Sequence, residues 1–159
     1  MLMIAFASIA SADVAAGATP AVVQAGNVEA RIALSADHAA GGRPLGVAVE
    51  IAVAWGWHIY GEPLPAGAGL TPTSIKFDTD LVARQKLELP KPTPLKFEAL
   101  NETYPVYQGS FKAAGDIVLA QKLKPGDYSI GGTLSFQECN DAICKMPQSV
   151  RFALPIKID

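Results

Sequence analysis

The sequence predicts an all-β protein that folds as a single antiparallel β-sandwich. Three observations lead to this fold class. Apolar residues recur with a period of two in short segments, which is typical of strands with one buried face. Fourteen glycines and twelve prolines separate these segments and supply turns. No segment keeps a helical period over three turns, and 159 residues suit one domain with its own core.

The first two strands are the clearest. "NVEARIALS", residues 27–35, alternates apolar and polar side chains. Its expected core face holds Val28, Ala30, Ile32 and Leu34. "LGVAVEIAVAW", residues 45–55, predicts a second and more deeply buried strand. Its expected core face holds Val47, Val49, Ile51, Val53 and Trp55.

The rest of the chain continues the same pattern. "TSIKFD", residues 73–78, predicts a strand with Ile75 and Phe77 facing inward. Three longer strands are expected at 115–123, 126–139 and 149–158, and "KPGD" between the first two predicts a turn. About seven short strands at this spacing favour a sandwich of immunoglobulin type. We therefore expect an immunoglobulin-like, antiparallel, single-domain fold.

The N-terminal residues predict export. "MLMIAFASIASA", residues 1–12, is apolar and ends in Ala10-Ser11-Ala12, which is typical of a signal peptide and its cleavage site. Residues 13–26 are expected to form a leader, so the folded domain should span residues 27–159. The net charge is −2 and there is no run of Lys or Arg. Nucleic acids and anionic membrane surfaces are therefore poor candidate partners.

The two cysteines, in "FQECNDAICKMP", are separated by four residues. In the strand 126–139, the predicted core face holds Tyr128, Ile130, Leu134 and Phe136. Cys139 and Gln137 fall on the opposite, polar face, so the sequence predicts an accessible Cys139. Asn140 and Asp141 favour a turn between the cysteines.

Three roles remain open for this cysteine pair. In a non-catalytic, immunoglobulin-like binding module the pair would form a structural hairpin disulfide, which would close a loop of about six residues and contribute only about 2 kcal/mol. A redox-active disulfide is the second possibility, because Cys139 is expected to be accessible and a bridge across so short a loop is a poor staple. Export makes a disulfide of either kind plausible, since oxidising compartments let disulfides persist. A copper(I) site is the third, in which Cys139, Cys144 and Met146 supply soft sulfur ligands and His38 or His58 joins them.

These residues resemble a known family. "FQECNDAICKMP" is similar to the aromatic-Gln-x-Cys-Asn-Asp-x-x-Cys-x-x-Pro signature of the periplasmic N-terminal domain of DsbD-type thiol:disulfide interchange proteins. "GWHIYGEP", "TPTSIKFD" and "VYQG" resemble the same domain, so the likeness spans roughly residues 28–158. Some family members have five residues between the cysteines where this chain has four.

The resemblance implies an immunoglobulin-like module of a protein-disulfide reductase, located in the periplasm. Its redox-active disulfide, with no further cofactor, would take electrons from a membrane-embedded domain or protein. Thioredoxin-fold clients would receive them, including a disulfide isomerase and the thiol reductants of cytochrome c biogenesis. Cys144 would form the mixed disulfide with the client, and Cys139 would resolve it. We expect a monomer.

The resemblance also implies a cap loop over the cysteine pair. That loop should lie within residues 97–109, with Tyr104 as the candidate for its aromatic tip. Tyr60 would line the wall beside the cysteines, and Gln137 and Asp141 would complete the surroundings. A structural interpretation stays open for the aromatic segment: its rings cover the sandwich edge, and His58 bonds a backbone carbonyl.

Overall fold

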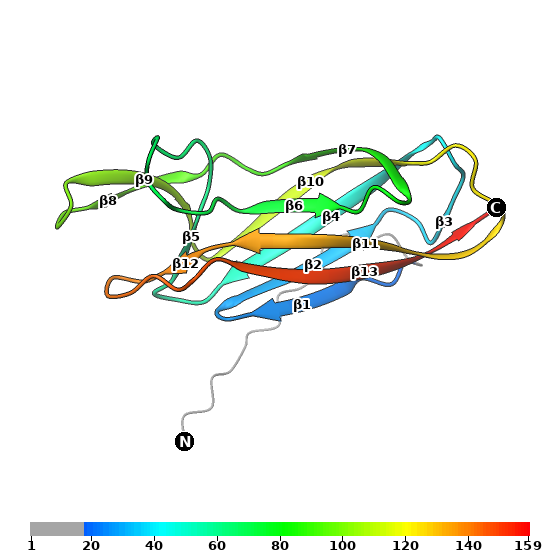
Figure 1. Ribbon diagram of the computed structural model, residues 1–159. Helices are drawn as coiled ribbons and strands as arrows, with labels where there is room; N and C mark the ends of the chain where they lie inside the picture. Colours follow the sequence, from blue (N-terminus) through cyan, green and yellow to red (C-terminus); the bar gives the residue numbers. More distant parts are fainter. Residues whose placement is uncertain (1–17) are drawn as a thin grey trace, which may run out of the picture.

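The computed structural model describes residues 18–159, and these residues form an elongated sandwich of β-strands (Figure 1). The first sheet has the strand order β1-β2-β4-β10-β7. Its strands are β1 (Ala21–Ala25), β2 (Val28–Leu34), β4 (Pro44–Val53), β10 (Ser110–Leu119) and β7 (Val82–Glu88). The second sheet has the order β3-β13-β11-β6. Its strands are β3 (His38–Ala39), β13 (Gln148–Ile158), β11 (Gly126–Phe136) and β6 (Ser74–Phe77).

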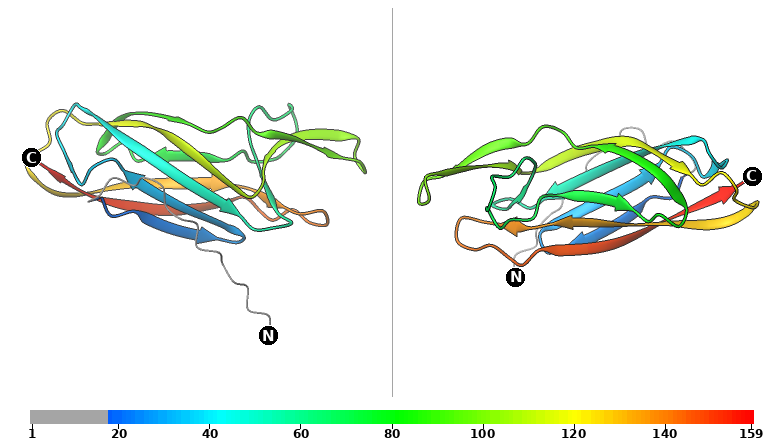
Figure 2. Two further views of the ribbon diagram at one scale, coloured as in Figure 1. Left: turned by 180° about the vertical axis from the view of Figure 1, so that it is seen from behind. Right: turned by 45° about the horizontal axis from the view of Figure 1, so that its top comes forward.

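All pairings in these two sheets are antiparallel except that of β3 with the end of β13. The two sheets pack face to face, as seen from behind and with the top tilted forward in Figure 2. A single apolar core lies between them, with members from both sheets. The predicted all-β sandwich is therefore confirmed. Within the described residues no helix is long and apolar enough to cross a membrane.

Period-two alternation builds the core as the sequence predicts. Every expected core residue of β2 is buried, and so are the four expected aliphatic residues of β4. On the second sheet, Ile130, Leu134 and Phe136 of β11 face the core, while Tyr128 is only partly buried. Gly132 lies opposite Phe152 of β13, and a Cβ at this glycine would overlap the Phe152 ring. The glycine thus gives an aromatic side chain room in the core.

A third, smaller sheet sits at one end of the sandwich, opposite the C-terminus (Figure 1). Its strand order is β12-β5-β9-β8. Its strands are β12 (Glu138–Cys139), β5 (His58–Tyr60), β9 (Glu102–Tyr107) and β8 (Thr93–Phe97). We call this region, together with the hairpin of residues 138–145, the cysteine end. Two hairpins project from it, one formed by β8 and β9 and the other by the cysteine segment (Figures 1 and 2).

Two sequence expectations differ from the fold. Trp55, expected in the core, is fully exposed. Strand β4 ends at Val53, and the chain turns through Gly56, whose φ of 83° is left-handed, so Trp55 lies outside the alternating strand. The expected leader 13–26 contains strand β1, whose residues pair in register with β2. The expected signal peptide, residues 1–12, lies outside the described residues.

Candidate thiol-disulfide site

The two cysteines form a disulfide in which the partners differ in exposure. The S–S distance is 2.01 Å, and the bond closes the hairpin between β12 and residue 144. Cys139 is 1% exposed and packs against Tyr60, Tyr104 and Val106. Cys144 is exposed. Only one side of the bond therefore faces solvent.

The prediction that Cys139 lies on an outward face is wrong. Strand β11 ends at Phe136, and after Gln137 the chain leaves that sheet to pair as β12 with β5. Residues 136–139 are consequently all buried, because the change of sheet breaks the alternation. The accessible partner of the disulfide is Cys144 instead.

The turn between the cysteines is held by its own polar groups. Oδ1 of Asn140 accepts hydrogen bonds from the backbone N–H groups of Ala142, at 2.9 Å, and Ile143, at 2.8 Å. The Asn140 N–H donates to the carbonyl of Ile143 at 2.9 Å, and the Lys145 N–H donates to the carbonyl of Glu138 at 3.0 Å. The hairpin therefore has a hydrogen-bonded frame in addition to the S–S bond. Asp141 lies exposed in the turn.

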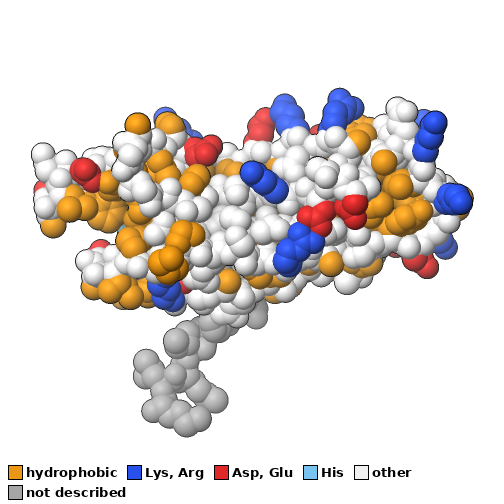
Figure 3. Space-filling view, viewed as in Figure 1, with side chains coloured by type: hydrophobic (Ala, Val, Ile, Leu, Met, Phe, Trp, Pro, Cys, Tyr) orange, Lys and Arg blue, Asp and Glu red, His pale blue; other side chains and the backbone are white. Residues whose placement is uncertain are grey.

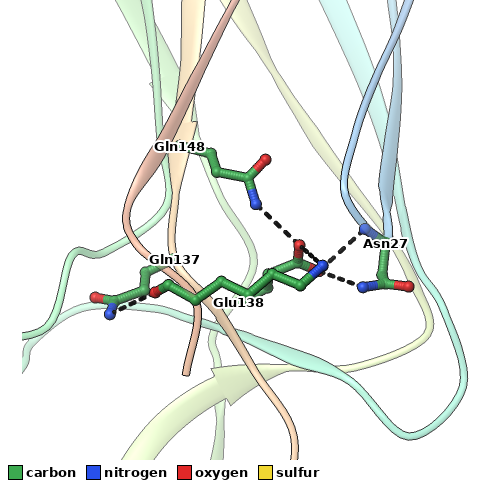
Figure 4. Close-up of polar contacts among 5 residues, drawn as sticks. Asn27, Gln137, Glu138 and Gln148 are labelled. Carbon is green, nitrogen blue, oxygen red and sulfur yellow. Dashed lines mark hydrogen bonds and ion pairs between the residues drawn. The ribbon is translucent and has the colours of Figure 1, made fainter. Parts of the chain in front are cut away.

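A buried carboxylate next to Cys139 joins three segments of the chain (Figure 4). Glu138 is 0% exposed. Its Oε2 accepts from the backbone N–H and the side-chain Nδ2 of Asn27, both at 3.0 Å. Its Oε1 accepts from Nζ of Lys145 and Nε2 of Gln148, both at 2.9 Å. The β1–β2 turn, the hairpin and the start of β13 thus meet on one side chain.

The hydrogen bonds keep Glu138 ionised. Removal from water raises the pKa of this carboxyl, but the bonds from Lys145, Asn27 and Gln148 together outweigh that effect, so its pKa lies below the usual value. Gly26 makes room for the carboxylate, because a Cβ there would overlap Oε1 of Glu138. This network was not predicted from the sequence. Its only signal was a charged residue beside a cysteine at the end of an apolar strand.

Gln137, predicted in the surroundings of the cysteines, forms hydrogen bonds to two separate segments of the chain. Its Oε1 accepts from the Thr71 N–H at 2.9 Å. Its Nε2 donates to the carbonyl of Lys145 at 3.1 Å (Figure 4). The side chain therefore links the loop before β6 to the cysteine hairpin. The ammonium of Lys145 also lies 4.6 Å from the centroid of the Trp57 ring, a cation–π geometry.

Aromatic side chains cover the buried side of the disulfide. The Tyr60 ring lies edge-on to the Tyr104 ring, 6.0 Å between centroids, and Phe97 packs against both Tyr104 and His58. Tyr104 lies in β9, where its hydroxyl donates to Glu102, and not at the hairpin tip. The exposed tip of the β8–β9 hairpin carries Leu100 instead. Tyr60 and Tyr104 are thus both beside the cysteines.

His58 and Tyr60 line up toward the exposed sulfur. Nε2 of His58 lies 3.2 Å from Oη of Tyr60, and this hydroxyl lies 4.0 Å from Sγ of Cys144. Burial lowers the pKa of His58, and the charge of Asp141 offsets part of this by raising it. Burial also raises the pKa of Tyr60, with a further contribution from Tyr104. His58 is therefore neutral and Tyr60 protonated near neutral pH.

The structure separates His38 from the other residues proposed for a copper(I) site. His38 forms a hydrogen bond with Asp159 at the far end of the sandwich, Nδ1 to Oδ1 3.0 Å, so it cannot join the cysteines. In residues 18–159 no group of three or more His, Cys, Asp or Glu side chains is placed to hold a metal ion. The sulfurs of Cys139 and Cys144 are bonded to each other.

Large exposed apolar side chains occur near Cys144. Ile143 and Met146 flank it along the hairpin, and both are exposed. Figure 3 shows hydrophobic side chains on both projecting hairpins of the cysteine end. Exposed apolar side chains around a reactive group are typical of a surface that meets another protein.

Comparisons with known proteins identify the family of this chain. The family model described as "Thiol:disulfide interchange protein DsbD, N-terminal" matches residues 24–156. The N-terminal periplasmic domain of ScsB from Proteus mirabilis is similar in structure, with a TM-score of 0.60 at 14% identity. That match covers 84% of this chain and 49% of the ScsB chain, so this chain spans about half the length of that structure.

The N-terminal domain of Neisseria meningitidis DsbD, in its reduced form, matches with a TM-score of 0.44 at 18% identity, covering 86% of this chain and 83% of that one. None of the curated proteins matches. The sheet topology and the match to the family model confirm the predicted immunoglobulin-like fold. Because the family model matches most of the sequence, this chain belongs to the family of DsbD N-terminal, thiol:disulfide interchange domains.

Proposed function

We propose that this domain passes electrons to partner proteins by disulfide exchange, with Cys144 as the attacking sulfur and Cys139 as the resolving one. Thiol-disulfide exchange itself follows from family membership, and the family uses a redox-active disulfide in place of a bound cofactor. The observation that carries the residue roles is the unequal exposure of the two cysteines. A partner sulfur has a direct approach to Cys144 only.

The exchange proceeds in two balanced steps. The Cys144 thiolate attacks one sulfur of the client disulfide, whose S–S bond breaks and leaves its electron pair on the second client sulfur. Cys139 then loses its proton and attacks Sγ of Cys144, which releases the first client sulfur as a thiolate. Two electrons and two protons have then moved from the domain to the client. Disulfide exchange with a reduced donor regenerates the dithiol.

The hairpin has supports in addition to the disulfide. The Asn140 turn, the Gln137 hydrogen bond and the Glu138–Lys145 ion pair all hold it. The S–S bond closes a loop with a sequence separation of 5, so it adds only about 2 kcal/mol by the chain-entropy model. These features favour a bond that opens and closes over a structural one.

The partners we propose follow the family. Thioredoxin-fold proteins of the periplasm would be the clients, and a membrane-embedded domain or protein would be the donor. Support comes from the structural likeness to the N-terminal periplasmic domain of ScsB, and from the exposed Ile143 and Met146 beside Cys144. The protein would act as one component of a protein-disulfide reductase.

Two single-cysteine variants test this assignment. Each is reduced and then mixed with an oxidised thioredoxin-fold protein, and the products are separated by non-reducing electrophoresis and identified by mass spectrometry. Cys139→Ala, which keeps Cys144, should accumulate a mixed disulfide. Cys144→Ala should not, because its remaining thiol is buried. Equal adduct formation by both variants, or by neither, would contradict the proposal.

A further inference from the structure

The chain His58–Tyr60–Cys144 connects a buried imidazole to the exposed sulfur through one hydroxyl. Both His58 and Tyr60 are 2% exposed, so neither side chain has water as its main partner. The two separations are 3.2 Å from Nε2 to Oη and 4.0 Å from Oη to Sγ. The latter is within the range of a hydrogen bond to sulfur.

When Sγ of Cys144 carries a negative charge, both hydrogen bonds from His58 through Tyr60 donate toward the sulfur. A thiolate accepts hydrogen bonds and cannot donate, so the Tyr60 proton points to Sγ. The Tyr60 oxygen is then free to accept from Nε2–H of His58, since a neutral imidazole carries one N–H. The lowered pKa of His58 and the raised pKa of Tyr60 agree with these protonation states.

We propose that His58 and Tyr60 form a hydrogen-bond chain that stabilises the thiolate of Cys144 during exchange. The inference rests on the proposed function and adds to it a means of stabilising the reacting thiolate. When Cys144 attacks a client disulfide, the chain raises the fraction of thiolate. When a donor's second thiolate attacks its own sulfur in a mixed disulfide with Cys144, the electron pair of the breaking S–S bond moves to Sγ. Tyr60 then stabilises that leaving thiolate.

Tyr60 is the catalytic member because its hydroxyl contacts the reacting sulfur. His58 acts through Tyr60 and is a positioning residue. It fixes the direction of the hydroxyl proton without itself changing charge. The proton lost by Cys144 goes to solvent, which is next to the exposed residue.

Other polar groups near Cys144 do not replace Tyr60 as a hydrogen-bond donor to its sulfur. The hydroxyl of Tyr104 is engaged with Glu102, and the ammonium of Lys145 is engaged with Glu138. Asp141 acts on His58 through its negative charge, which favours protonation of the imidazole without outweighing burial. A thiolate at Cys144 would therefore depend on Tyr60 for its nearby buried donor.

The experiment uses the Cys139→Ala protein, in which Cys144 is the single thiol. Its thiolate absorbance near 240 nm is followed from pH 5 to pH 11, together with the rate of reaction with 5,5′-dithiobis(2-nitrobenzoic acid), a small disulfide. Tyr60→Phe should lower the thiolate fraction at pH 7 about tenfold, the loss of one charge-assisted hydrogen bond. The attack rate should fall about threefold, because the less stabilised thiolate is more nucleophilic.

Two variants of His58 distinguish its role as a hydrogen-bond donor to Tyr60 from its role in packing. His58→Gln keeps an N–H at the same distance from Cβ and should retain most of the thiolate fraction. His58→Leu removes the donor and should fall toward the Tyr60→Phe value, and combining it with Tyr60→Phe should cost no more than Tyr60→Phe alone. The matched control is Tyr107→Phe, which removes a buried hydroxyl that donates to the carbonyl of Pro90, at 2.7 Å, and not to sulfur.

The outcomes separate the two proposals. If the parent Cys139→Ala protein does not react with the small disulfide, the proposed function fails. If it reacts but Tyr60→Phe matches Tyr107→Phe in thiolate fraction at every pH, the hydrogen-bond chain is overturned while exchange stands. Circular dichroism of each variant establishes that it is folded. If Tyr60→Phe does not fold, His58→Leu takes its place in the comparison, and a thiolate fraction equal to that of Tyr107→Phe would equally overturn the hydrogen-bond chain.

Discussion

The body of the sandwich and its cysteine end are built on different principles. The body packs two sheets on a mainly aliphatic core, with strands of up to 11 residues paired along their length. The cysteine end has strands of 2 to 6 residues. Beside aromatic rings it buries the carboxylate of Glu138, the imidazole of His58, and the side chains of Thr73, Gln137 and Cys139. One region buries apolar area, and the other satisfies buried polar groups one by one.

This difference explains where chemistry is possible. An aliphatic core offers no group that attacks, donates or accepts, but it holds β11 and β13 rigidly up to the point where the cysteine segment begins. At that point the chain changes sheets, and Glu138 and Gln137 replace apolar packing with directed hydrogen bonds. The body therefore supplies stability, and the cysteine end supplies a hairpin whose S–S bond can open.

The largest expected effect on stability lies in the body. Leu154 of β13 is 0% exposed, and Leu154→Ala should lower the free energy of unfolding by about 2–5 kcal/mol. Denaturant titration measures this change, and the reduction potential of the cysteine pair should stay unchanged. The control is Trp55→Ala, which should stay within about 0.5 kcal/mol because the ring is fully exposed. A shifted potential in Leu154→Ala would show that the two regions are not separate.

The next largest effect should come from Glu138. Glu138→Ala leaves donors of Asn27, Gln148 and Lys145 without their acceptor, and it should cost about 2–3 kcal/mol. The value stays below that of a fully buried pair because Lys145 is 36% exposed and can reach water. Denaturant titration of Glu138→Ala and Glu138→Gln measures it. A loss under 0.5 kcal/mol in both would contradict the structural role of the network.

Glu138 should also make stability depend on pH. Its pKa in the folded state lies below the usual value of 4.5, so its contribution is fully present above pH 4.5 and is lost as pH falls through the lowered folded pKa. Thermal unfolding of the native protein and of Glu138→Gln from pH 7 to pH 2 measures this dependence. The variant should lose less stability than the native protein below pH 4.5. Parallel curves would show that this carboxylate does not titrate in that range.

The smallest effect should come from the disulfide itself. The double variant Cys139→Ala/Cys144→Ala should lose about 2 kcal/mol and keep its β-sheet circular dichroism. The aliphatic core and the hairpin's own hydrogen bonds remain in place. Chemical denaturation of the double variant against the oxidised protein gives the number. Loss of the fold would mean that the bond is a structural element of the cysteine end.

The same contrast decides what the sequence could predict. The body follows period two, so the core faces of β2, β4 and β11 could be identified from alternation alone. Trp55 could not, because the left-handed turn at Gly56 ends the strand two residues before it. Alternation also failed for Cys139, since a change of sheet at Gln137 leaves no mark in the pattern.

The polar contacts of the cysteine end were not predictable either. Glu138 and Asn27 are 111 residues apart in the sequence, and Tyr60 and Cys144 are 84 apart. Such pairs meet only because β1, β5 and β12 are brought to one end by the topology. What the sequence did offer was the resemblance of "FQECNDAICKMP" to a family signature, and the family match confirms that resemblance.

The reduction potential of the Cys139–Cys144 pair tests the central claim most directly. The protein is equilibrated with a series of glutathione or dithiothreitol buffers, and its redox state and fold are followed together. We expect a value more oxidising than about −300 mV, with the fold intact in the reduced form. A potential below about −300 mV, or unfolding upon reduction, would contradict electron transfer through this disulfide and show that it is a structural bond.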